Sequence, residues 1–198
     1  MQAIASPSRG DDAAAMLRTC VAAAKTEGSV CLFLEPIALY HERDLYSEGD
    51  GGWLADHEPP ERWGAAHVPL GRGRLYGTGS DLTIITFGNG VRMCLRIARK
   101  LAADGIGTRV LDLRWLAPLP YEDLLRAAAA TGTVLVADET RRTGGVSETV
   151  ITTLVDAGFT GRIARVASHD SFIPLGDAAG TVLLSEAAIE DAARDLLR

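Results

Sequence analysis

The stretch Val134–Val150 reads VLVADETRRTGGVSETV and combines a strand, a polar loop and the start of a helix. Its opening run, Val134–Ala137, is short, apolar and β-branched, as is typical of a strand buried in a parallel sheet. From Val146 onward, apolar residues return at helical spacing. In open α/β sheets, ligands and partners collect at the carboxyl ends of strands. The loop between these two elements is therefore the first candidate site in the chain.

The same alternation of strand and helix continues on both sides of this stretch. Apolar runs at 82–87, 109–113 and 162–166 predict further strands, and segments with apolar residues at helical spacing separate them. Ser185 precedes the last helical segment and is expected to cap it. This alternation predicts an α/β fold of three layers, in which helices cover both faces of a mostly parallel sheet.

The N-terminal part of the chain is less complete. Asp11 or Asp12 is expected to cap a helix that Gly28 ends. Val30–Leu34 (VCLFL) has no polar alternation, which predicts a strand buried on both faces. One helix and one strand cannot enclose a core by themselves. We therefore interpret the beginning of the chain as the terminal fragment of a domain.

Three regions follow from these patterns. Residues 1–45 form the partial α/β segment, and residues 46–79, rich in charge, glycine and proline, are expected to be an interdomain linker. A short edge strand is expected within residues 72–76, near the end of that linker. Residues 80–198 contain the regular alternation and form the second domain.

Composition excludes several classes of partner. The chain carries 20 Lys and Arg against 26 Asp and Glu, a net charge of −6, so nucleic acid and anionic membrane surfaces are poor partners. No apolar run reaches the roughly 20 residues of a membrane helix. Residues 1–12 lack the apolar core of a secretion signal. The three cysteines have no C-x-x-C spacing, which predicts free thiols and a cytoplasmic location.

The loop after Val134–Ala137 allows two interpretations. As a ligand site, the helix that begins at Val146 would bind an anion at its N-terminus, with help from the two arginines. As a structural loop, its carboxylates would accept backbone N–H groups or pair with the arginines, and the glycine pair would permit unusual backbone angles and close approach. We favour the structural interpretation, because carboxylates at this position repel anions. The candidate interface or ligand residues are Asp138, Glu139, Arg141, Arg142, Gly144, Gly145 and Glu148.

Other motifs are weak. Gly88-Asn89-Gly90 lacks the third glycine of a dinucleotide fingerprint, since position 93 is Met93, and predicts an ordinary strand-to-helix turn. His169-Asp170-Ser171 are consecutive, which favours a solvated loop over a catalytic triad. The histidines show no metal-ligand spacing. We therefore predict no catalytic, cofactor-binding or metal-binding residue within this chain.

Five segments nevertheless resemble one family in order and spacing. The resemblance covers almost the whole chain and is to the β subunit, or β half, of thiamine-diphosphate-dependent 2-oxo acid dehydrogenases, the decarboxylating component of the pyruvate and branched-chain complexes. The segments are SPSRGDDAAAMLR (6–18), VCLFLEPIALY (30–40), DLTIITFGNGV (81–91), VLDLRWLAPLP (110–120) and VADETRRTGGVSE (136–148).

The resemblance implies a fold for each region. Residues 1–45 correspond to the end of a pyrimidine-binding domain, and residues 80–198 to a transketolase C-terminal domain. It implies an enzyme that decarboxylates a 2-oxo acid oxidatively and transfers the acyl group to a lipoyl group. Thiamine diphosphate and magnesium belong to the full enzyme, but no residue here matches the family's sites for them, so this chain alone is expected to be inactive and to bind neither.

The resemblance also implies partners. The family's C-terminal domain serves assembly, so we expect self-association, pairing with the missing α and pyrimidine-binding portions, and docking of the lipoyl transacylase component. Two alternatives remain. The chain could be a stand-alone interaction module without chemistry, or part of a transferase similar to transketolase or deoxyxylulose-phosphate synthase.

Overall fold

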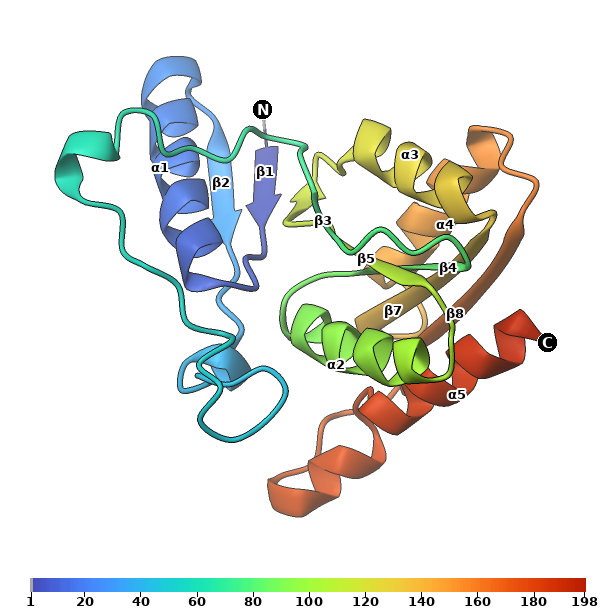
Figure 1. The fold of residues 1–198 in the computed structure, drawn as a ribbon. Coiled ribbons are helices and arrows are strands. Elements are labelled where there is room, and N and C mark those ends of the chain that lie inside the picture. The colour runs from blue at the N-terminus through green and yellow to red at the C-terminus, as the bar shows by residue number, and fades with distance from the viewer. Residues whose placement is uncertain (1) are drawn as a thin grey trace.

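The computed structural model describes residues 2–198 and contains two sheets (Figure 1). A three-stranded sheet has the order β2-β1-β6, and a five-stranded sheet has the order β3-β5-β4-β7-β8. The strands are β1 (Gln2–Ala5), β2 (Val30–Phe33), β3 (Arg74–Tyr76), β4 (Leu82–Thr86), β5 (Thr108–Asp112), β6 (Trp115–Ala117), β7 (Thr133–Arg141) and β8 (Arg162–Ser168). The α-helices are α1 (Gly10–Glu27), α2 (Asn89–Ala103), α3 (Tyr121–Thr131), α4 (Val146–Asp156) and α5 (Glu186–Leu197).

The five-stranded sheet forms the middle layer of a three-layer α/β unit, as the sequence predicts. Its strands are parallel except β3, which pairs antiparallel with β5 at one edge. Helices α2 and α5 cover one face, and α3 and α4 cover the other (Figure 1). Each face has its own buried cluster, centred on Ile84 and Leu101 on the α2 side and on Ile85 and Leu154 on the α4 side.

The small sheet joins the N-terminal segment of the chain to the residues that follow β5. Strand β6 lies beyond β5 in the chain, yet it pairs antiparallel with β1 at the N-terminus. Trp115 on β6 is fully buried against Ala3, Ala5 and Met16. Strands β1 and β6, of four and three residues, were not predicted from the sequence.

The start of α1 differs from the expectation. The prediction that Asp11 or Asp12 caps this helix is wrong, because α1 begins at Gly10 with Arg9 in the N-cap position. Both aspartates lie instead in the first turn, where the helix dipole stabilises a carboxylate. Gly28 ends the helix in the left-handed conformation, as predicted.

The prediction that Val30–Leu34 is buried on both faces is also wrong. Strand β2 is an edge strand, and Val30 and Leu32 are 64% and 46% exposed. On the neighbouring helix, Leu17 and Val21 are 49% and 51% exposed. The reason is that no strand among residues 2–198 pairs with the outer edge of β2. Cys31 and Phe33 pack on the α1 side of the small sheet, so Val30 and Leu32 point to the opposite side. We call the exposed edge of β2, together with these apolar side chains of β2 and α1, the β2–α1 face.

The segment between the two units is irregular, with short 3-10 turns at Ile37–Leu39 and Pro60–Arg62. Trp53 is nonetheless buried in the cluster on the α2 side of the large sheet, so this segment packs along the surface of that unit. A third 3-10 turn, Gly176–Thr181, precedes α5. Among residues 2–198, no helix combines the length and apolar character needed to cross a membrane.

Candidate functional site

The carboxyl edge of the five-stranded sheet contains a topological switch point beside its central strand. The chain passes from β4 to β5 on one side and later returns to β7 on the other. In such sheets a crevice opens between the loops that leave the two neighbouring strands. Here those loops are the turn into α2, beginning at Gly88, and the segment after Ala137.

Glu139 fills this crevice. Its carboxylate accepts hydrogen bonds from the backbone N–H of Gly90 and from Asn89 Nδ2, the latter at 3.3 Å. Both donors belong to the first turn of α2, which is where a bound anion would sit. Burial raises the pKa of the Glu139 carboxyl, although the Gly90 and Asn89 donors counteract the rise. The chain's own carboxylate thus occupies the position of a ligand.

The backbone of Gly88 brings the N-terminal part of the chain into the same crevice. Its φ of 55° and ψ of −132° lie in a region that residues with a Cβ rarely adopt. A Cβ at this position would also lie 3.4 Å from Pro36 Cγ and 3.4 Å from Ser6 Oγ. The crevice is therefore closed from one side by Glu139 and from the other by the small unit.

A second carboxylate caps the next helix. Asp138 is fully buried and accepts hydrogen bonds from the backbone N–H groups of Ser147 (2.6 Å) and Thr140 (2.8 Å). Ser147 lies in the first turn of α4, so this helix N-terminus is occupied as well. Neither arginine of the loop pairs with Asp138 or Glu139 among residues 2–198.

Residues 140–144 of the predicted loop are exposed, Gly145 is buried, and contacts within the loop and with Asp170 hold the segment in place. Arg141 Nε donates to the carbonyl of Thr143 (3.0 Å), and the backbone N–H of Thr143 donates to Asp170 (2.8 Å). Gly144 has a φ of 70°, whereas Gly145 has a φ of −83°. A Cβ on Gly145 would come 2.5 Å from the carbonyl oxygen of Arg141. Gly145 is therefore required for close approach within the loop and not for a positive φ.

The two remaining predicted residues face solvent at the side of β8. Arg142 is exposed, and its carbonyl accepts a hydrogen bond from Arg165 Nη1 at 3.1 Å. Glu148 in the first turn of α4 pairs with the same Arg165 at 3.5 Å. His169 lies in an exposed segment beside this loop, as predicted for a solvated position.

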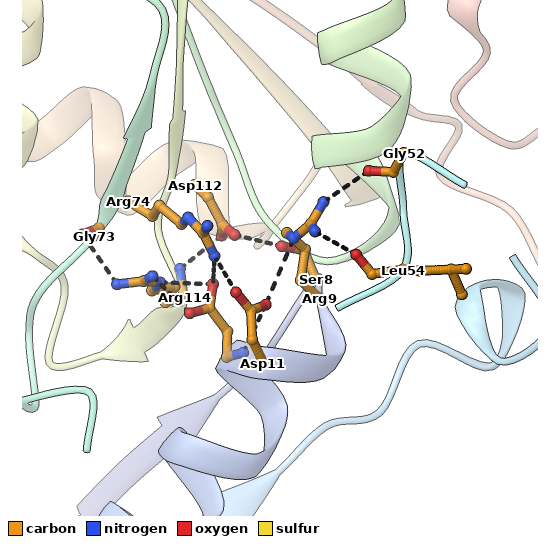
Figure 2. A network of polar contacts seen from close by, with 10 residues as sticks. Ser8, Arg9, Asp11, Gly52, Leu54, Gly73, Arg74, Asp112 and Arg114 are labelled. Carbon is orange, nitrogen blue, oxygen red and sulfur yellow. Dashed lines mark hydrogen bonds and ion pairs between the residues drawn. The ribbon is translucent and has the colours of Figure 1, made fainter. Parts of the chain in front are cut away.

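A denser polar cluster lies where α1 meets the end of β5, and sequence reasoning missed it (Figure 2). Asp12 is buried and binds Arg114 through both carboxylate oxygens, at 2.6 Å and 3.0 Å. Arg74 Nη1 lies 3.1 Å from Asp12 and 3.0 Å from Asp11. These contacts join α1 to β3 and to the residues between β5 and β6.

A buried carboxyl stands behind these ion pairs. Asp112 accepts hydrogen bonds from Ser8 Oγ at 2.5 Å and from the backbone N–H of Arg114 at 2.9 Å (Figure 2). Burial raises the pKa of Asp112 to about 7, against the opposing effect of these two donors. Asp112 therefore changes charge near neutral pH while it holds the N-terminal segment.

Arg9 connects the same cluster to the segment between the units. Its terminal nitrogens donate to the carbonyls of Gly52 (3.2 Å) and Leu54 (2.9 Å), and its guanidinium lies 5.0 Å above the Trp53 ring. The sequence offered one signal for this cluster, which is that SPSRGDD and VLDLR both belong to the segments that resemble the family. No spacing rule could pair them, since Asp12 and Arg114 are 102 residues apart.

The carboxyl edge of the large sheet does not fit a diphosphate with its magnesium ion. Within residues 2–198, no three His, Cys, Asp or Glu side chains converge as ligands for a metal ion. The helix N-termini of α2 and α4, which could bind a diphosphate, carry Glu139 and Asp138 instead.

Comparisons with known proteins agree with this architecture. The 1-deoxy-D-xylulose-5-phosphate synthase 1 of Geobacter sulfurreducens is 36% identical over 132 residues, which cover 61% of this chain and 21% of that protein. The pyruvate dehydrogenase E1 component subunit beta of Staphylococcus epidermidis is 29% identical over 166 residues, which cover 82% of this chain and 49% of that protein. This chain thus spans less than half the length of these curated relatives.

A solved structure and a family model add to this. The structure, titled "Split gene transketolase, inactive beta4 tetramer", superposes with a TM-score of 0.73 at 24% identity and covers 99% of this chain and 57% of that one, which shows a shared fold. The model described as "Transketolase, C-terminal domain" matches residues 71–192, more than half of the chain. The resemblance of this sequence to the thiamine-diphosphate-dependent β subunits is confirmed, and the chain belongs to the transketolase C-terminal domain family.

Proposed function

We propose that this chain is the assembly portion of a thiamine-diphosphate-dependent 2-oxo acid dehydrogenase. In the complete enzyme, which binds thiamine diphosphate and magnesium elsewhere, a 2-oxo acid is decarboxylated and its acyl group passes to a lipoyl group. One observation carries the assembly role. The helix N-termini at the carboxyl edge of the large sheet are occupied by the chain's own Glu139 and Asp138, which supports a structural role for this edge over an anion site.

The lengths of two matches support the choice of a dehydrogenase over the transferase alternative. The match to the pyruvate dehydrogenase β subunit extends over 82% of this chain, whereas the match to the deoxyxylulose-phosphate synthase covers 61% at higher identity. The longer match favours a β-subunit arrangement for both parts of the chain. In the proposed division, residues 1–45 complete a pyrimidine-binding domain, residues 46–79 link, and residues 80–198 form the transketolase C-terminal domain.

The open β2–α1 face fits a missing portion of the small unit. Strand β2 presents an unpaired edge, and unpaired edges accept a further strand by backbone hydrogen bonding. The exposed side chains of Leu17, Val21, Val30 and Leu32 add an apolar surface around that edge. We therefore place the upstream pyrimidine-binding portion on this face.

The loop from Asp138 to Glu148 is proposed as a second contact surface. Its buried carboxylates hold it rigid, while Arg141, Arg142 and Glu148 remain exposed. A rigid, charged projection suits self-association or docking of the lipoyl transacylase component, because little side-chain order has to be gained on binding.

Co-expression tests the proposed function. A tagged form of this chain is produced with the α subunit and the upstream half of the β subunit of a pyruvate dehydrogenase. We expect co-purification and decarboxylation of a 2-oxo acid with an artificial electron acceptor. Leu32→Asp on the β2–α1 face should abolish the complex, and Leu75→Asp on β3, which is similarly exposed, should not.

Three outcomes contradict the proposal. Formation of 1-deoxy-D-xylulose 5-phosphate by the reconstituted chain would support the transferase alternative, and absence of any complex would support a stand-alone module. Calorimetric titration of the chain alone with thiamine diphosphate and magnesium is expected to give no saturable heat. Micromolar binding in that titration would mean that the chain contains a cofactor site.

A further inference from the structure

Two of the three cysteines lie against each other in the small unit. Cys20 is on α1 and Cys31 is on β2, and both pack in the apolar cluster that contains Met16 and Trp115. The Sγ atom of Cys31 lies 3.6 Å from the backbone carbonyl oxygen of Cys20. All three cysteines of the chain are free thiols, as the sequence predicts.

The two neighbouring thiols also influence each other. Burial, and then the adjacent Cys31 thiol, raise the pKa of Cys20 to about 11. One ionisable side chain shifts another clearly only when the two groups are within about 4–6 Å. Together with the contact between Cys31 and the Cys20 carbonyl, this places the two sulfur atoms close enough for a bond between them to form with small side-chain movements.

The two thiols differ in their access to solvent. Cys31 is partly exposed, whereas Cys20 is only 4% exposed. A thiol reacts as its thiolate, and it has to reach solvent to lose its proton and to meet a reagent. The geometry therefore assigns the first reaction with a reagent to Cys31, and Cys20 is the internal thiol behind it.

Cys94 provides a comparison within the same chain. It is 0% exposed and belongs to the separate cluster on the α2 side of the large sheet. Burial raises the pKa of its thiol, which keeps the thiol protonated and unreactive. A reagent that distinguishes accessible from buried thiols should therefore leave Cys94 unmodified in the folded chain.

We propose that Cys20 and Cys31 form a site of reversible oxidation that closes to an intramolecular disulfide. The oxidant is a low-molecular-weight disulfide such as oxidised glutathione. The Cys31 thiolate attacks one sulfur of the oxidant, which gives a mixed disulfide and releases one thiolate. The Cys20 thiolate then attacks the Cys31 sulfur and releases the second thiolate, so two electrons and the two cysteine protons pass to the oxidant.

The disulfide connects α1 to the edge strand β2. It closes a loop between residues that are 11 positions apart, which restricts the unfolded chain and so stabilises the folded unit. Both elements carry side chains of the β2–α1 face, so oxidation fixes the geometry of that face. The reaction requires only the two thiols and the oxidant, and it is therefore independent of the proposed function.

Peptide mapping of the oxidised full chain tests this proposal. The folded chain is incubated with oxidised glutathione, and its free thiols are alkylated. It is then unfolded, alkylated with an isotope-labelled form of the same reagent, and digested with trypsin without reduction. Cleavage after Arg18, Lys25 and Arg43 places the two cysteines in separate peptides, 19–25 and 26–43.

We expect these two peptides to be joined and to separate on treatment with dithiothreitol. The peptide that contains Cys94 should carry only the second, labelled reagent. Oxidation should also raise the melting temperature of the chain, because the disulfide restricts the unfolded state.

Variants assign the effect to the pair. Cys31→Ser should abolish the joined peptide and the rise in melting temperature. Cys94→Ala is the matched control, because it removes a thiol outside the pair, and it should retain both. The mapping of the wild-type chain decides the proposal even where a variant does not fold.

Three results would overturn the proposal. The first is the absence of the joined peptide after oxidation of the folded chain. The second is a mixed disulfide of Cys31 with glutathione that persists without closing onto Cys20. The third is a yield of joined peptide that rises with protein concentration, which would indicate links between molecules in place of a link within one.

Discussion

Replacing Asp12 by Asn should weaken the contact between the two units of the chain and lower its free energy of unfolding. Asp12 has a side-chain exposure of 6% and binds Arg114, whose side chain is 14% exposed, through both oxygens. Asn has the same shape but no charge, so Arg114 loses its carboxylate partner at a buried position. Removing one partner of a buried ion pair costs about 3–5 kcal/mol. Arg74 keeps Asp11 as a partner, which places the expected cost near the lower end, about 3 kcal/mol.

Urea unfolding of the wild-type and variant chains measures this cost. The expected result is a lower midpoint with an unchanged slope, because the surface exposed on unfolding stays the same. Asp195→Asn is the matched control, since Asp195 pairs with Arg198 at a distance of 2.8 Å on the exposed end of α5. An exposed pair of this kind contributes about 0–1 kcal/mol.

A double-mutant cycle isolates the ion pair itself. Arg114→Gln combined with Asp12→Asn should be less destabilised than the sum of the two single variants, by about 1–3 kcal/mol. The reasoning is refuted if Asp12→Asn costs less than about 1 kcal/mol, or no more than Asp195→Asn, or if the two single costs add without coupling.

Three further predictions concern single positions. Because burial raises the folded-state pKa of Asp112 to about 7 from 3.8, its protonated form stabilises the fold fully at low pH. That contribution is lost as the pH rises from about 4 to about 7, by at most about 1.4 kcal/mol per pH unit, and Asp112→Asn should remove this dependence from urea midpoints measured across the window. Gly88→Ala should cost about 1–3 kcal/mol because of its backbone angles, whereas Gly10→Ala, with open space around it, should cost nothing in the same denaturation assay; equal effects would contradict the geometry. Gly145→Val should weaken self-association measured by sedimentation and also lower the melting temperature, because its Cβ would clash within the loop; unchanged melting would show that the loop adjusts freely.

The regular part of the fold could be predicted from the sequence because its signals are local. The strand at Val134–Ala137 lies within β7, and the helix predicted from Val146 begins there. Ser185 caps α5 by accepting the N–H of Ala188 at 3.1 Å, as its position predicts. In each case, neighbouring residues decide the conformation, and a window of a few residues contains the information.

The joint between the units could not be predicted in the same way. Strand β6 follows β5 closely, yet its partner is β1, more than a hundred residues earlier. The burial of Asp12 depends on Arg114, which no periodicity connects to it. Only the resemblance connected the segments that contain Asp12 and Arg114. It gave their order along the chain but did not indicate that they are in contact.

The exposed face of α1 marks a different limit of sequence reasoning. In the sequence of α1, apolar residues recur at helical spacing at Met16, Leu17, Cys20, Val21 and Ala24. The structure buries Met16 and Cys20 and leaves Leu17 and Val21 exposed. The pattern records the surfaces that the sequence can bury, and the described residues leave some of them uncovered.

The two units of the molecule differ in how easily a partner could cover them. To open the crevice beside β4, Glu139 must leave the N–H of Gly90 and the amide of Asn89 without a partner, and each unpaired buried donor costs about 1–3 kcal/mol. The α4 terminus presents the same obstacle through Asp138. The β2–α1 face has no such obstacle, because its strand edge is unpaired and its side chains are already exposed. A partner therefore gains free energy by covering this face and loses it by entering the crevice, which places the proposed docking of the missing portion on the small sheet.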